Sequence, residues 1–343
     1  MKYGIVYYKD TANLGDDILT YAGTKFLPHI DYYIDREAMD LFVPDEKEYV
    51  ATIVNGFYLH YPFTFQISPY VLPYFIGIHF TRDAFVYNDY SYLDGYNSNY
   101  LKKYSPIGCR DYHTVQVLKE KGIPAYFSGC LTLTLTPFQD VTCNHKVILT
   151  DVSDNISNYV KNMKLGKEVQ NITHRMTPET IGQKWSVREK RVEEYLKLYQ
   201  GADLVITSRL HCALPSVALG TPTILVGKYD EDFNNRLASF SAYVPTCGEN
   251  DILSGKMDQL IKTPQKSVEH VQMAERIREN CKKFSDSVLC GRYDASALPD
   301  IELYNSLYCE RNKFMRESCF RLIDKNNSLM WENIQLRQKN NLG

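Results

Sequence analysis

The stretch ADLVITSRLHCALPSVALGTPTILVG, residues 202–227, predicts a strand, a helix and a second strand in direct succession. The first strand, residues 203–207, is almost wholly apolar, which is typical of a parallel strand covered on both faces. Ser208 suits the N-cap of a helix over about residues 209–219, and Gly220 suits its end. This helix would begin at the carboxyl end of a buried strand, which is where open α/β sheets bind ligands.

The first turn of this predicted helix carries Arg209, Leu210 and His211. Free backbone N–H groups and the positive end of the helix dipole attract an anion at such a position. Arg209 adds a planar fork for carboxylate or phosphate, and His211 adds a group that transfers protons near neutral pH. Alternatively, Arg209 forms a surface ion pair and His211 is a satisfied core residue. Their joint occurrence at one helix start favours the anion-binding interpretation.

Length and composition limit the class of protein. The chain has 343 residues, enough for two domains, and its 44% hydrophobic and 23% charged residues are typical of a globular protein. A net charge of −2 argues against a general nucleic-acid binder. The nine cysteines include no CxxC pair, which favours reduced thiols in the cytoplasm over disulfides or a zinc site. We expect no metal, no transmembrane helix, and a first strand in place of a secretory signal.

Strand-like and helix-like segments alternate twice along the chain, which predicts an α/β fold with mainly parallel sheets. The first series covers residues 1–142 and the second, residues 143–290. Residues 300–343 form a separate tail with apolar residues at roughly helical spacing: Leu303, Leu307, Phe314, Ile323, Leu329, Ile334 and Leu336. We expect this tail to be a helix that makes the protein a homo-oligomer. Peripheral contact with a membrane surface, through Phe314, Phe320 and Trp331, is the weaker alternative.

A second group of polar residues, Asn13-Leu14-Gly15-Asp16-Asp17, occupies the first strand-to-helix turn. Gly15 permits a tight bend, and carboxylates are favoured at a helix start. Asp16 is explained as a helix cap alone, but a carboxylate at this edge of a sheet can also accept a proton from a sugar hydroxyl. Many of the 27 tyrosines fall between residues 58 and 104, where they suit either sugar rings or an aromatic core.

Together these segments resemble the polysaccharide pyruvyl transferase family. The resemblance rests on the NLGDD turn, CRDYHT (residues 109–114), FSGCLTLTL (residues 127–135) and, above all, SRLHCALPSVALGTPTI (residues 208–224). It implies two Rossmann-like domains facing across a cleft, as in GT-B enzymes, with an N-terminal acceptor domain and a C-terminal donor domain. It also implies transfer of pyruvate from phosphoenolpyruvate to a sugar as a cyclic ketal, with release of phosphate and no cofactor.

In the family the Arg-Leu-His step contacts phosphoenolpyruvate, so Arg209, Leu210 and His211 inherit that role. The second anionic group of this donor would be held by Arg110, or by Arg175 with His174. His211 is our candidate general acid, and Asp16 or Asp17 the general base on the acceptor diol.

For the acceptor we expect contacts from Asn13, Gly15, Asn55 and Tyr58. The chain departs from the family here: Asn55-Gly56-Phe57-Tyr58 stands where many members have a glycine-rich stretch. This difference predicts an altered sugar pocket.

Two alternatives remain open at the level of sequence. The first is a GT-B glycosyltransferase that uses a nucleotide sugar, and the second is a non-catalytic scaffold in a polysaccharide assembly complex. For the pyruvyl transferase we expect an acceptor that is a surface-polysaccharide precursor, such as that of a capsule, linked to polyprenyl diphosphate. The protein would then act in the cytoplasm, at the inner face of the membrane.

Overall fold

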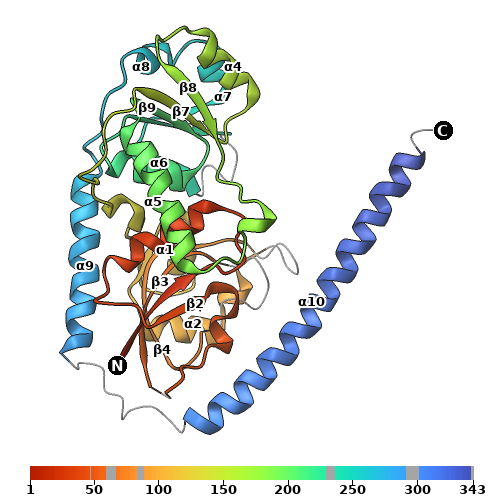
Figure 1. The fold of residues 1–343 in the computed structure, drawn as a ribbon. Coiled ribbons are helices and arrows are strands. Elements are labelled where there is room, and N and C mark those ends of the chain that lie inside the picture. The colour runs from red at the N-terminus through yellow and green to blue at the C-terminus, as the bar shows by residue number, and fades with distance from the viewer. Residues whose placement is uncertain (47, 59–66, 83–88, 229–235, 291–300, 341–343) are drawn as a thin grey trace.

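The computed structural model describes residues 1–46, 48–58, 67–82, 89–228, 236–290 and 301–340, and these form two α/β domains and a long helix (Figure 1). The predicted fold, two Rossmann-like domains with a helical tail, is confirmed. None of the helices in these ranges combines the length and apolarity needed to cross a membrane.

The N-terminal domain contains a six-stranded parallel sheet in the order β2-β1-β3-β4-β5-β6. Its central strands are almost wholly buried because helices cover both faces. The strands are β1 (Lys2–Tyr7), β2 (Tyr32–Asp35), β3 (Val50–Tyr58), β4 (Val71–Phe80), β5 (Ile107–Cys109) and β6 (Ala125–Phe127). The helices are α1 (Leu14–Thr24), η1 (Arg36–Leu41), η2 (Ser91–Leu93), α2 (Tyr96–Lys103), α3 (Tyr112–Glu120) and η3 (Leu131–Thr134).

The C-terminal domain contains a five-stranded parallel sheet in the order β11-β10-β9-β7-β8. Its strands are β7 (Lys146–Thr150), β8 (Glu168–Ile172), β9 (Leu204–Thr207), β10 (Thr223–Gly227) and β11 (Thr246–Gly248). Its helices are α4 (Asp154–Asn162), η4 (Pro178–Thr180), α5 (Trp185–Gly201), α6 (Leu210–Ala218), η6 (Ala238–Phe240), α7 (Glu249–Leu253) and α8 (Asp258–Lys262).

One hydrophobic core runs through the junction of the two domains, where α1 lies against α5 and α6. The buried Asp17 of α1 forms an ion pair with the equally buried Arg188 of α5. Helix α9 (Val271–Leu289) follows the second domain in sequence but packs against the first: Phe284 stacks on Tyr74, and Ser285 donates to the carbonyl of Phe26. These contacts join the two domains.

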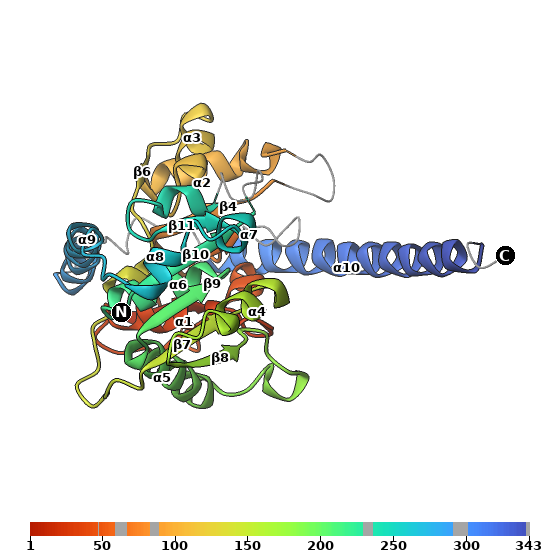
Figure 2. The same cartoon turned by 90° about the horizontal axis from the view of Figure 1, so that it is seen from above.

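The tail is a 40-residue helix, α10 (Ile301–Asn340), that projects away from both domains (Figure 2). Near its start it contacts η1, where Arg316 pairs with Asp40 and the thiol of Cys309 lies near the carbonyl of Asp40. Beyond Arg316 most of its described side chains are exposed.

Candidate functional site

The site lies where the starts of α1 and α6 meet between the domains. The amide of Leu14 donates to the carbonyl of His174 at 2.9 Å, and that of Met176 donates to Ala12 at 2.8 Å. A Cβ atom on Gly15 would lie 3.1 Å from the Cβ of His211, which is tighter than ordinary packing. Glycine at position 15 therefore lets the NLGDD turn approach the first turn of α6.

A cavity of about 220 Å³ opens at this junction. Its walls combine three arginines with two histidines, and none of the described residues lining it is acidic. The lining residues are Asn13, Gly15, Arg110, His174, Ser208, Arg209, Leu210, His211, Arg236 and Leu237. Such a concentration of positive charge suits a small, multiply charged anion.

Arg110 is the residue of this cavity best placed to bind an anion. It follows β5, is only 1% exposed, and its Nη1 lies 3.4 Å from Nε2 of His211. Its Nε and Nη2 atoms are buried with no hydrogen-bond partner among the described residues. Burial, with the nearby charge of Arg236, lowers the pKa of Arg110. Buried guanidinium nitrogens are normally satisfied, so an anionic ligand is the natural partner for these two.

Burial favours the neutral form of both histidines of the cavity. His211 accepts a hydrogen bond from Arg110, which only donates, so Nε2 of His211 carries no proton. Burial and the charges of Arg110 and Arg236 lower the pKa of His211 well below its usual value. Burial also lowers the pKa of His174 to about 4, and Nε2 of that ring lies 2.6 Å from the hydroxyl of Tyr199. His211 can act as an acid only if a bound anion restores its proton affinity.

Arg209, not Ser208, is the N-cap residue of α6. The hydroxyl of Ser208 instead donates to the carbonyl of Asp151 at 2.6 Å. Nε of Arg209 donates to the Asp151 carboxylate at 2.7 Å, which fixes the side chain while about a third of it stays exposed. Leu210 is buried and contributes an apolar wall to the cavity.

The two predicted general bases differ in availability. Both carboxylate oxygens of Asp17 accept hydrogen bonds from Arg188, and Asp17 is fully buried. Asp17 therefore has a structural role, and the prediction that it acts as the general base is wrong. Asp16 is partly exposed and accepts a hydrogen bond from Thr11 at 2.6 Å. Its charge also acts on Arg110, although Asp16 is not among the residues that line the cavity.

Three further predicted site residues lie outside the cavity. Asn55 and Tyr58 belong to β3, which continues through Tyr58, so both lie inside the sheet. Asn55 donates to the carbonyl of Leu19, and Tyr58 donates to that of Asn55. These internal bonds correct the expectation that the two side chains contact an acceptor. Arg175 is exposed and pairs by its backbone with Asn13.

Arg236 and Leu237, which no sequence pattern predicted, reach the cavity from a segment just before η6. The guanidinium of Arg236 also lies 5.3 Å from the ring centre of Phe57. No local pattern distinguishes this arginine from others in the chain, and only the fold brings it to the site.

Elsewhere in the described chain, Cys143, His145 and Asp203 have ligand atoms within 4.8 Å of one another. Lys167 pairs with Oδ2 of Asp203 at 2.6 Å, and its positive charge beside this group disfavours a cation there. This group lies where β7 and β9 begin, at the opposite edge of the sheet from the cavity.

Solved structures with low sequence identity share the architecture. An uncharacterised protein from Klebsiella pneumoniae is 14% identical, with 72% of this chain and 92% of that chain covered and a TM-score of 0.39. UDP-GlcNAc 2-epimerase from Methanocaldococcus jannaschii, solved with UDP-GlcNAc and UDP, is 13% identical, with coverages of 85% and 100% and a TM-score of 0.42. The Escherichia coli heptosyltransferase WaaC with ADP is 12% identical, with coverages of 82% and 100% and a TM-score of 0.34.

No curated protein sequence matches the chain. The family model of polysaccharide pyruvyl transferase matches residues 13–228, a span that runs from the N-cap of α1 to just past β10 and includes every residue that lines the smaller cavity except Arg236 and Leu237. With more than half of its length matched by that model, the chain belongs to the polysaccharide pyruvyl transferase family and is a transferase.

Proposed function

We propose that the protein transfers pyruvate from phosphoenolpyruvate to a diol of a surface-polysaccharide precursor, forming a cyclic ketal and releasing phosphate. The observation that carries this proposal is the buried Arg110, whose Nε and Nη2 lack partners in a cavity without acidic residues among those described. Phosphoenolpyruvate is a small anion with a carboxylate and a phosphate. Arg110 and Arg209 face the cavity from opposite domains, so each can hold one of these groups.

The reaction then proceeds by a series of proton transfers. His211, its proton affinity raised by the bound anion, protonates the methylene carbon C3, while a sugar hydroxyl attacks C2. The proton from the first hydroxyl passes to Asp16. The C2–O bond to phosphate breaks, the second hydroxyl closes the ketal at C2, and its proton leaves with phosphate. The products are the ketal and hydrogen phosphate. Asp16 then releases its proton to solvent, which balances the proton that His211 took up when the donor bound.

The size of the cavity and the buried guanidinium nitrogens of Arg110 also separate this function from the alternatives. A nucleotide sugar needs room for a base and ribose beside its diphosphate, and about 220 Å³ is below the ~300–1,000 Å³ typical of such sites. A non-catalytic scaffold gives no reason for buried guanidinium nitrogens without partners. We further propose that the acceptor is carried on polyprenyl diphosphate and that the protein works in the cytoplasm at the membrane face.

Thermal unfolding with phosphoenolpyruvate tests the donor. A ligand at 100 times its Kd stabilises a protein by about 2.7 kcal/mol, so saturating phosphoenolpyruvate should raise the melting temperature clearly. Arg110→Met should weaken this binding by about 30-fold or more, since a hydrogen-bonded charge contributes about 2 kcal/mol. Arg276→Met, at an exposed site on α9, is the control. Stabilisation by nucleotide sugars and not by phosphoenolpyruvate would contradict the proposal.

A further inference from the structure

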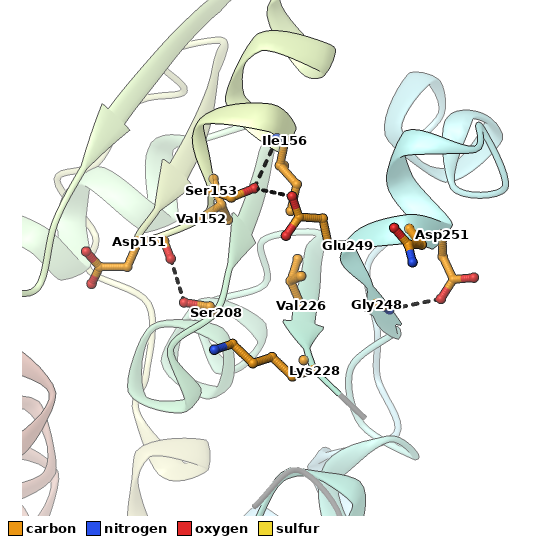
Figure 3. Close-up of a pocket in the computed structure, with 12 residues that line it drawn as sticks. Asp151, Val152, Ser153, Ile156, Ser208, Val226, Lys228, Gly248, Glu249 and Asp251 are labelled. Atoms are coloured by element: carbon orange, nitrogen blue, oxygen red, sulfur yellow. Dashed lines mark hydrogen bonds between the residues drawn. The ribbon is translucent and has the colours of Figure 1, made fainter. Parts of the chain in front are cut away.

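A second, larger cavity of about 660 Å³ lies wholly within the C-terminal domain (Figure 3). Its walls come from the carboxyl ends of β7, β9, β10 and β11. Strands β7 and β9 are neighbours in the sheet, but the chain passes from β7 first to β8 on the other side. Ligands of open α/β sheets bind at such a reversal. Asp151 follows β7 and Ser208 follows β9, so the cavity sits at this position.

The cavity combines an apolar surface with a ring of hydrogen-bonding groups. Val152, Ile156 and Val226 supply the apolar surface, and the polar lining residues are Asp151, Ser153, Ser208, Lys228, Glu249, Asn250 and Asp251. A pyranose has the matching character, because its C–H bonds form apolar faces and its hydroxyls both donate and accept. The volume lies within the ~300–1,000 Å³ of small-molecule sites and exceeds that of the cationic cavity threefold.

This cavity lacks the excess of positive charge that marks the first. Oε1 of Glu249 is fixed by Ser153 at 2.8 Å and by Asn155 at 3.2 Å, as Figure 3 shows for Ser153. Asp251 accepts from the amide of Gly248 at 2.9 Å. Of the other acidic residues that line the cavity, Asp151 pairs with Arg209 and Asp251 pairs with Lys256. Glu249 and Lys228, the single cation among the described lining residues, therefore leave the cavity close to neutral, and sugar hydroxyls would donate to the carboxylate of Glu249.

The two cavities adjoin at one point. Ser208 lines both of them. Asp151 lines the larger cavity, while its carboxylate holds Arg209, which lines the smaller one. A sugar in the larger cavity would therefore have its hydroxyls next to the donor.

We propose that the larger cavity is the binding site for the saccharide acceptor, so that donor and acceptor are both recognised mainly by the C-terminal domain. This inference rests on the proposed pyruvyl transfer. It replaces Asn55 and Tyr58 with Glu249, Ser153 and Asp251 as the acceptor contacts. The ligand is a neutral pyranose, and the phosphate of any carrier lies outside the cavity.

Saturation-transfer NMR detects weak sugar binding and tests this proposal. The probes are methyl pyranosides of glucose, galactose, mannose and N-acetylmannosamine, each in the presence of saturating inorganic phosphate. We expect transfer to at least one pyranoside in the wild-type protein. Asn250→Trp, which places an indole at the cavity wall, should abolish it, and Glu249→Gln should reduce it several-fold. Asn162→Trp, at the exposed far end of α4, should leave it unchanged.

Phosphoenolpyruvate stabilisation of the same variants separates this proposal from the first. If Asn250→Trp and Glu249→Gln keep the donor response while sugar binding falls, both proposals are supported. Sugar binding that survives in Asn250→Trp, no pyranoside bound by the wild type, or transfer to UDP in place of the pyranosides would overturn the acceptor site. None of these outcomes bears on the proposed donor site. That proposal is contradicted only if phosphoenolpyruvate does not stabilise the wild type.

Discussion

At the scale of residues, the site depends on groups whose proton affinities are set by burial. His211 and His174 sit among positive charges, and burial lowers the pKa of both. This arrangement favours neutral imidazole rings, so the arginines supply the positive charge of the site. Donor binding should therefore take up a proton, because the incoming anion favours the charged form of His211.

His174 gives a pH dependence whose sign can be worked out. Its pKa falls from 6.5 to about 4 on folding, so below pH 6.5 the unfolded chain binds a proton that the folded protein does not. The stability contributed by neutral His174 is complete above pH 6.5 and is lost as the pH falls towards 4, by roughly 3 kcal/mol in total.

Urea unfolding of the wild type and of His174→Gln at pH 7 and pH 4.5 measures this effect. The free energy of unfolding of the wild type should fall further between these pH values than that of the variant. His145→Gln, at an exposed position, is the control. Equal pH dependence in wild type and His174→Gln would mean that His174 is protonated in the folded state.

At the scale of elements, α1 and α5 are joined by a buried ion pair. Both oxygens of Asp17 accept from Arg188, which also donates to the carbonyls of Tyr8 and Lys9. The neighbouring Asp16 makes its hydrogen bond on the accessible side of α1. Adjacent carboxylates thus have different roles because the helix turns about 100° per residue.

Asp17→Asn should destabilise the protein by about 3–5 kcal/mol, since it leaves the Arg188 charge buried without its partner. Asp16→Asn should change stability by less than about 1 kcal/mol and should slow phosphate release. Chemical denaturation and a phosphate-release assay measure the two effects. Asp17→Glu keeps the charge and should fall between Asp17→Asn and the wild type. A folded, fully stable Asp17→Asn that is inactive would restore Asp17 as the base.

At the scale of the whole molecule, α10 carries a seven-residue repeat along its projecting part. Leu322, Leu329 and Leu336 recur at one heptad position, and all three are about half exposed or more. Three residues before each leucine stand Cys319, Asn326 and Asn333. Leucine at d with asparagine at a is typical of parallel coiled coils whose register the asparagines fix.

We therefore predict a parallel homodimer through α10, in which the two Cys319 side chains face each other. Mild oxidation should give a disulfide-linked dimer that Cys319→Ser lacks. Leu329→Glu should give a monomer by light scattering while leaving phosphoenolpyruvate stabilisation unchanged, because α10 lies outside both cavities. Trp331→Gln, at the outward f position, is the control and should stay dimeric. A wild-type monomer would contradict the coiled-coil interpretation.

Much of the candidate site could be predicted from sequence because it is local. A buried strand, a cap and a helix start place Arg209, Leu210 and His211 within one turn, and helix geometry leaves little freedom. The two series of strands and helices likewise fix two parallel sheets, because short connections and right-handed crossovers restrict the topology.

Only the tertiary structure decided which distant residues join them. Arg110 lies about a hundred positions from His211, and Arg236 has no local signal, yet both line one cavity. Tertiary packing likewise buries Asp17 while Asp16 stays partly exposed, and it places Asn55 and Tyr58 inside β3. Sequence periodicity specifies which face of an element is buried, but the neighbours of that face depend on how whole elements pack. The charge of the site is thus a property of the junction between domains, not of any one segment.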